Sequence, residues 1–132
     1  MDLNSLITRN RHRLSVGLAT DDEVAKLVLD APDGTLKGRV EGWHLIALRG
    51  ESEDGPVASL RCLGWSGGET WITSEVTAVA RDRSTITTRS GSLYQLGESA
   101  AGEVHPRLVM LVGRALHAWG LSDALDLGVF GR

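Results

Sequence analysis

The spacing of apolar positions predicts one strong helix towards the C-terminal end of the chain. Pro106 fits the first turn of this helix, where its missing N–H costs nothing, and Gly120 favours a left-handed stop. Between them, apolar residues recur at intervals of three and four, which places them on one helical face. These residues are Leu108, Leu111, Val112, Ala115, Leu116 and Trp119. We therefore expect a helix from Pro106 to Trp119 that packs through this face.

A shorter helix is predicted in the N-terminal half. Thr20 can accept a hydrogen bond from the first-turn amides while Glu23 reaches back to the backbone of Thr20, which is the capping-box pattern. The apolar residues that follow form one stripe, so the helix is expected from Asp21 to about Leu29. Residues 14–18 alternate in the manner of a strand, and residues 1–13 are interpreted as a flexible or helical arm.

The central part of the chain has the pattern of short strands separated by turns. Apolar and β-branched residues occur in five runs bounded by Gly, Ser and Asp, at residues 43–48, 57–65, 71–80, 85–88 and 93–96. Ser90 and Gly91 fit a two-residue hairpin turn, because glycine tolerates positive φ. Such close spacing favours an antiparallel β-meander curled into a barrel-like sheet. The predicted fold class is therefore α+β, with about five strands, the short helix, and the C-terminal helix packed on the sheet.

Length and composition indicate a folded, single-domain protein. The 132 residues are close to the commonest domain size, and 42% hydrophobic and 23% charged residues are ordinary for a globular chain. Cys62, the one cysteine, lies in an apolar run and is expected to be buried. The N-terminus lacks the continuous apolar run of a secretory signal, and no segment reaches the ~18 apolar residues of a membrane span. We expect a cytoplasmic protein with no membrane association.

The sequence gives only weak support for a catalytic or metal-binding site. His105 and His117 are separated by twelve positions, whereas ligands on one helix converge at spacings of three or four. The Gly-flanked serines at 66 and 90 lack the strand–elbow–helix context of a catalytic serine, and no phosphate loop or dinucleotide fingerprint occurs. The sequence therefore favours a protein without catalytic residues, metal or cofactor, and a small hydrolase or transferase is the third hypothesis for its function.

Arginines around the predicted hairpin form the first candidate binding surface. Arg81, Arg83 and Arg89 lie near its ends, and Tyr94 offers an aromatic ring. Guanidinium groups beside hydroxyls and a stacking ring can hold phosphate or nucleic acid. The net charge of −3 argues against a nucleic-acid surface spread over the whole protein. The interpretation favoured over binding is a solvated β surface whose edge arginines discourage aggregation.

The outer face of the C-terminal helix is the second candidate surface. Arg107, Met110, Arg114 and His117 follow one another along this face. A methionine flanked by arginines suits a protein interface, although the interpretation favoured over binding for this face too is an ordinary solvated helix surface.

The strings at residues 73–76 and 88–97 resemble strings found in small uncharacterised proteins of bacteria and mobile elements. This resemblance names no family and implies no function. The leading hypothesis is a non-enzymatic protein-interaction or regulatory protein whose partner is another protein, for example an accessory or inhibitory protein of a phage or plasmid. A nucleic-acid-binding module that uses the arginine-rich β-hairpin ranks second. Nothing in the sequence sets the oligomeric state.

Overall fold

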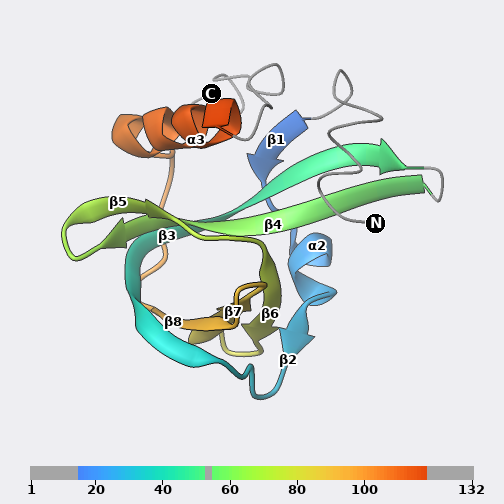
Figure 1. Cartoon of the computed structure of the whole chain (residues 1–132), viewed down its shortest axis with the longest axis vertical. Coiled ribbons are helices and arrows are strands. Elements are labelled where there is room, and N and C mark those ends of the chain that lie inside the picture. The colour runs from blue at the N-terminus through green and yellow to red at the C-terminus, as the bar shows by residue number, and fades with distance from the viewer. Residues whose placement is uncertain (1–14, 53–54, 119–132) are drawn as a thin grey trace.

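The computed structural model describes residues 15–52 and 55–118. This part of the chain is a mixed α+β structure with a core made mostly of sheet (Figure 1). The strands are β1 (Ser15–Leu18), β2 (Val28–Leu29), β3 (Thr35–Ser52), β4 (Gly55–Ser66), β5 (Glu69–Ile72), β6 (Val76–Ala80), β7 (Thr85–Thr88) and β8 (Ser92–Leu96). The helices are α2 (Asp21–Ala25) and α3 (Pro106–Ala118).

The long, bent strand β3 organises the whole sheet. Its first half pairs in parallel with β8, from Thr35 opposite Ser92 to Val40 opposite Leu96. Its second half pairs antiparallel with β4, and β1 joins this half on the other side. The strand order is β2-β6-β7-β8-β3-β4-β5, with β1 off this path. The pairing of β3 with β4 shifts register in a bulge that contains Gly42, at φ +55, a backbone conformation that glycine adopts without strain.

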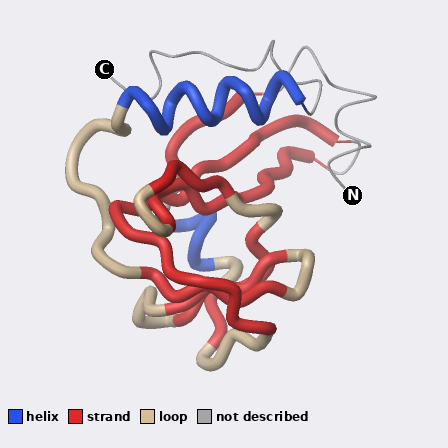
Figure 2. The backbone as a smooth tube through the Cα atoms, turned by 60° about the vertical axis from the view of Figure 1, so that its left-hand side comes forward, coloured by secondary structure: helices blue, strands red, loops and turns tan. Residues whose placement is uncertain are grey.

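Side chains from the two faces of β3 enter two separate hydrophobic clusters. Helix α3 lies across one face of the β1-β3-β4-β5 region, while α2, β2 and the β6-β7-β8 strands lie on the other side (Figures 1 and 2). The cluster beneath α3 consists of Val16, Ile46, Leu48, Leu63, Val104, Leu108, Val112 and Leu116. The other cluster consists of Val24, Val40, Leu45, Ala47, Leu60, Cys62, Val76, Val79, Ile86 and Leu96. Because both faces of β3 are covered here, residues 44–48 are all buried and do not alternate with polar residues.

The predicted fold class is correct at the level of α+β, with a core made mostly of sheet and two helices in the described part of the chain, and the structure differs from it in the number of strands and in the closure of the sheet. The described residues contain eight strands where about five were expected, and the sheet is open rather than closed into a barrel. Two strand pairs, β3 with β8 and β2 with β6, are parallel, so the sheet is not a simple antiparallel meander. Both parallel pairs join segments that lie far apart in the chain.

Several element boundaries also differ from the predictions. The helix expected from Asp21 to Leu29 ends at Ala25, because Val28 and Leu29 pair with β6 as strand β2. The strand expected over residues 71–80 is broken into β5 and β6. Residues 35–42, left unassigned by the pattern, form the first part of β3. The C-terminal helix is confirmed over Pro106–Ala118, whereas Trp119 and the arm predicted at residues 1–13 lie outside the described residues.

Candidate functional site

The outer face of α3 gathers the second set of predicted site residues. Arg107, Met110, Arg114 and His117 are all exposed, and their spacing places them in one stripe along the helix. The opposite face is anchored in the core through Leu108, Val112 and Leu116, which are 0–1% exposed. Met110, near the middle of the stripe, is 65% exposed. This stripe of four residues is called the α3 face below.

Contacts with Trp65 of β4 fix the beginning of α3. The Arg107 guanidinium lies over the Trp65 ring, with its central carbon 5.2 Å from the ring centroid. The ring of His105 meets the same indole edge-on, at 5.4 Å between centroids. His105 also caps the helix, because its Nδ1 accepts a hydrogen bond from the Arg107 N–H (3.1 Å). Trp65 was not among the predicted site residues, and no local signal links it to a helix forty residues later.

The α3 face is basic. Segment 106–118 contains Arg107, Arg114 and His117 and no Asp or Glu. Within the described residues, neither of these arginines forms an ion pair with a carboxylate. His117 lies in the last turn, where a positive charge is favoured by the helix dipole. An acidic partner would therefore meet cations that are not already neutralised by the part of the chain described here.

The hairpin arginines do not form one patch. Arg81 and Arg83 lie in the β6–β7 turn and Arg89 lies in the β7–β8 turn, so they are separated by the length of β7, roughly 13 Å at ~3.3 Å per residue. Arg81 donates through Nε to Asp30 Oδ1 (2.9 Å), and Arg89 donates through Nε to Glu75 Oε1 (2.7 Å). Both arginines are exposed in these ion pairs. The predicted hairpin around Ser90 and Gly91 does form, from β7 and β8, with Arg89 at its turn and with Arg81 and Arg83 at the other end of β7.

The ring of Tyr94 lies beside Trp71 rather than beside an arginine turn. The two ring centroids are 6.4 Å apart with the planes tilted by 54°. Tyr94 is half-buried against the core, whereas Trp71 of β5 is 41% exposed. Tyr94 was among the predicted site residues and Trp71 was not, because the two strands that carry these rings are not hydrogen-bonded neighbours.

A hydroxyl cluster holds the β7–β8 turn against the corner between β5 and β6. The Ser90 hydroxyl lies 3.0 Å from Thr88 Oγ1, 3.1 Å from Ser92 Oγ and 3.4 Å from Ser74 Oγ. The backbone N–H of Arg89 donates to the Glu75 carbonyl oxygen (2.8 Å). Because these hydroxyls form hydrogen bonds with one another, their role in stabilising the turn is enough to explain their presence.

Arg61 of β4 is a buried charge near the same corner. Its side chain is 8% exposed, and burial lowers the pKa of its guanidinium, with Glu75 opposing this change and Arg89 adding to it. Arg61 was not among the predicted site residues, because it lies in a run whose apolar residues predict a buried strand.

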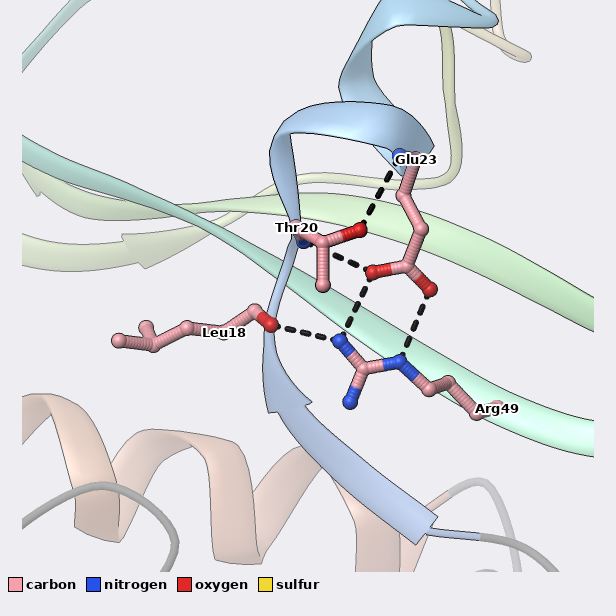
Figure 3. A network of polar contacts seen from close by, with 4 residues as sticks. All are labelled: Leu18, Thr20, Glu23 and Arg49. Atoms are coloured by element: carbon pink, nitrogen blue, oxygen red, sulfur yellow. Dashed lines mark hydrogen bonds and ion pairs between the residues drawn. The ribbon is translucent and has the colours of Figure 1, made fainter.

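Arg49 and Glu23 form a polar network between β3 and α2 (Figure 3). Arg49 donates through Nε to Glu23 Oε2 and through Nη2 to Glu23 Oε1, both at 2.8 Å, and Nη2 also donates to the Leu18 carbonyl oxygen (2.6 Å). The predicted capping box is confirmed, because Thr20 N–H donates to Glu23 Oε1 (2.8 Å) and Glu23 N–H donates to Thr20 Oγ1 (3.2 Å). The Arg49 hydrogen bonds, followed by those from Thr20, lower the pKa of Glu23 to about 2 against the opposing effect of burial. The network holds α2 in place.

Cys62 is buried, and the described residues contain no cluster of side chains that could bind a metal ion. Cys62 is fully buried, as predicted, and burial raises the pKa of its thiol to about 12, so the nucleophilic thiolate is scarce at neutral pH. No group of three or more His, Cys, Asp and Glu side chains among residues 15–52 and 55–118 could hold a metal ion. In the same residues, no helix is both long enough and apolar enough to span a bilayer.

Comparison with protein-family models, with curated proteins and with solved structures finds no match to this chain.

Proposed function

We propose that this chain is a non-enzymatic protein-binding module that docks another protein on the α3 face. The observation that carries the proposal is Met110, which is 65% exposed between Arg107 and Arg114 on a helix whose other face is firmly packed. Methionine and arginine are enriched at protein interfaces, where a pliable apolar side chain fills gaps and guanidinium groups pair with carboxylates. Such a module would act as an accessory or inhibitory protein by occupying its partner.

Charge complementarity defines the chemistry of the partner. The α3 face is basic and segment 106–118 has no acid, although the protein as a whole has a net charge of −3. An acidic segment is therefore attracted to α3 and repelled by much of the remaining surface, which fixes the docking position as well as the rate of encounter. We propose an acidic amphipathic segment as the partner, with an apolar side chain that covers Met110.

Fluorescence anisotropy with two labelled synthetic helices tests this proposal. One peptide combines Glu and Leu in an amphipathic pattern, and the other carries Lys in place of every Glu. We expect the acidic peptide to bind with an affinity that falls as salt rises, and the basic peptide not to bind. Met110→Ala should weaken binding of the acidic peptide.

Two charge-reversed double variants locate the binding surface. Arg107→Glu with Arg114→Glu should abolish binding of the acidic peptide. Lys37→Glu with Arg81→Glu makes the same change in net charge at exposed positions away from α3, and should retain most of the binding. Equal losses in the two variants would contradict a docking site on α3 and would leave only a general charge effect. Melting curves of both variants check that the fold is kept.

One observation supports nucleic-acid binding as the second candidate. Trp71 is 41% exposed beside Tyr94, and such a ring pair is a surface on which an unpaired base can stack. The separation of the arginines and the ion pairs of Arg81 and Arg89 give this candidate less support than the α3 face. Trp71→Ala should weaken binding of a labelled single-stranded oligonucleotide if this second function is the correct one.

A further inference from the structure

A pocket of about 250 Å³ lies where four stretches of chain meet, at residues 18–24, 43–45, 83 and 99–100. These stretches are the end of β1 with α2, the bulged part of β3, the β6–β7 turn and the connection that leads to α3. The volume equals that of about eight water molecules in the liquid, at ~30 Å³ each. It is slightly below the range of typical small-molecule sites, so the pocket suits a ligand smaller than a nucleotide.

The walls of the pocket are mostly apolar. Val24 of α2 and Leu45 of β3 belong to the hydrophobic cluster on the side of β3 that faces the β6-β7-β8 strands. Trp43 of β3 packs against the same cluster. Leu18, at the end of β1, is 42% exposed at the same place. The indole N–H of Trp43 is already used, because it donates to the Gly97 carbonyl oxygen (3.0 Å). A hydrocarbon group would therefore lie against a preformed apolar surface.

Two opposite charges line the pocket without neutralising each other. Asp21 and Arg83 both lie on its wall, yet no ion pair joins them, and neither pairs with another charged group in the described residues. Among these residues, Nη1 of Arg83 is buried and has no hydrogen-bond partner. A buried guanidinium nitrogen without a partner is costly, and a ligand acceptor reached by a small movement of the side chain would remove that cost.

The backbone of Arg83 gives an independent reason to examine this residue. Its φ of +63° is the one positive value at a non-glycine residue in the described chain. The Arg83 N–H donates to the Ala80 carbonyl oxygen (2.9 Å), which places Arg83, with its left-handed backbone, at the last position of a four-residue β-turn. Glycine is preferred at this position, and a residue with a Cβ there costs free energy. The turn by itself disfavours an arginine here, which suggests that the Arg83 side chain has a function other than forming the turn.

We infer that this pocket binds a small zwitterion of the amino-acid class with an apolar side chain. The ligand carboxylate would pair with Arg83, its ammonium group would pair with Asp21, and its side chain would lie against Trp43, Val24 and Leu45. A phosphate or a simple carboxylate matches only half of this arrangement, because Asp21 repels it. The inference does not depend on the α3 face, since the pocket and that face share no residue.

His44 and Ser99 provide uncharged polar groups at the same site. His44 is 8% exposed, and burial lowers the pKa of its imidazole, so the ring is neutral at neutral pH. A neutral imidazole and a hydroxyl can orient a ligand through hydrogen bonds without changing the balance of one positive and one negative charge on the wall.

Isothermal titration calorimetry of the full chain with three related probes tests the charge requirement. L-leucine carries both charges, leucinamide lacks the carboxylate, and N-acetyl-leucine lacks the ammonium group. We expect saturable binding of leucine, and binding of each analogue that is weaker by about tenfold or more, which is the effect of ~1.4 kcal/mol. Absence of leucine binding in the millimolar range, or an analogue that binds as tightly as leucine, would overturn the inference.

Two pairs of matched variants assign the contacts. Arg83→Gly should abolish leucine binding while leaving the melting temperature unchanged or higher, because glycine suits the positive φ. Arg81→Gly, in the same turn but outside this pocket, should keep the binding. Asp21→Asn should likewise lose about tenfold in affinity, whereas its neighbour Asp22→Asn should not. A variant pair in which both members behave alike would contradict the assigned contact, and the melting curves show that each variant is folded.

Discussion

The contact between Glu23 and Arg49 predicts a specific loss of stability in acid. The folded protein lowers the pKa of the Glu23 carboxyl from 4.5 to about 2, chiefly through the Arg49 hydrogen bonds. A carboxyl with a lowered pKa in the folded state stabilises the fold above its unfolded pKa. This stabilisation is therefore fully present at neutral pH and is lost as the pH falls from about 5 through about 2.

The size of the effect can be bounded from the same contact. The difference between a pKa of 4.5 and one of about 2 corresponds to at most about 3–4 kcal/mol, at ~1.4 kcal/mol per pH unit. The Glu23 side chain is 17% exposed and that of Arg49 is 34% exposed, so solvent screens part of the interaction. We expect a contribution of about 1–2 kcal/mol to the free energy of unfolding at neutral pH.

Glu23→Gln isolates this contribution. Glutamine keeps the shape of the side chain and can keep the capping-box hydrogen bond to the Thr20 N–H, so the substitution removes mainly the charge. Urea unfolding should show the variant to be about 1–2 kcal/mol less stable than the wild type near pH 7, with less than half of that difference left near pH 3.

Asp22→Asn is the matched control, because Asp22 is an exposed carboxylate in the same turn that does not contact Arg49. Its stability difference from the wild type should change little with pH. A Glu23→Gln variant as stable as the wild type at neutral pH would refute the reasoning. So would a deficit that stays constant down to pH ~3, because the lost energy would then not come from the carboxylate charge.

The remaining predictions concern packing and reactivity. Leu116→Ala removes a fully buried side chain and should lower the free energy of unfolding by ~2–5 kcal/mol, whereas Leu111→Ala, at a half-buried position, should lower it less. Equal losses of stability in urea unfolding would contradict the assignment of the buried face of α3. In Gly64→Ala, the new Cβ would lie 2.6 Å from Cγ1 of buried Val40, so we expect a melting temperature lowered by the equivalent of ~1–3 kcal/mol. An unchanged melting temperature would show that the corner of β3 is loosely packed. The Cys62 thiol should react slowly with a disulfide reagent near pH ~8 in the folded protein and rapidly in denaturant, and fast reaction of the folded protein would contradict its burial.

Local chemistry in the sequence determined the elements whose signals lie within a few residues. The capping box at Thr20 and Glu23 forms as predicted, because both partners belong to one helical turn. The spacing of apolar residues located α3, since a helix repeats every 3.6 residues whatever it packs against. The sequence also placed the Arg107, Met110, Arg114 and His117 positions on one exposed face, because the same repeat fixes both faces of a helix.

The candidate pocket could not be predicted in the same way. Arg83 was selected for its charge within a supposed arginine patch, whereas its position beside Trp43 and Asp21 arises from four stretches that meet only in the folded chain. Trp65 beneath Arg107 is a similar case. Contacts between residues forty or more positions apart leave no mark on the local spacing of apolar and polar residues.

The tertiary structure alone decided how the strands pair. The first half of β3 lies in parallel beside β8, and β2 lies in parallel beside β6, although both pairs join segments about fifty residues apart. The hydrophobic pattern gives the face on which a side chain lies but not the strand to which its backbone is hydrogen-bonded. In the second half of β3 even that signal is absent, because α3 covers one face and the β6-β7-β8 strands cover the other. Local sequence signals therefore predicted the helices and turns. The order of strands in the sheet depended instead on which distant backbone groups could form hydrogen bonds with one another while both hydrophobic faces of β3 remained covered.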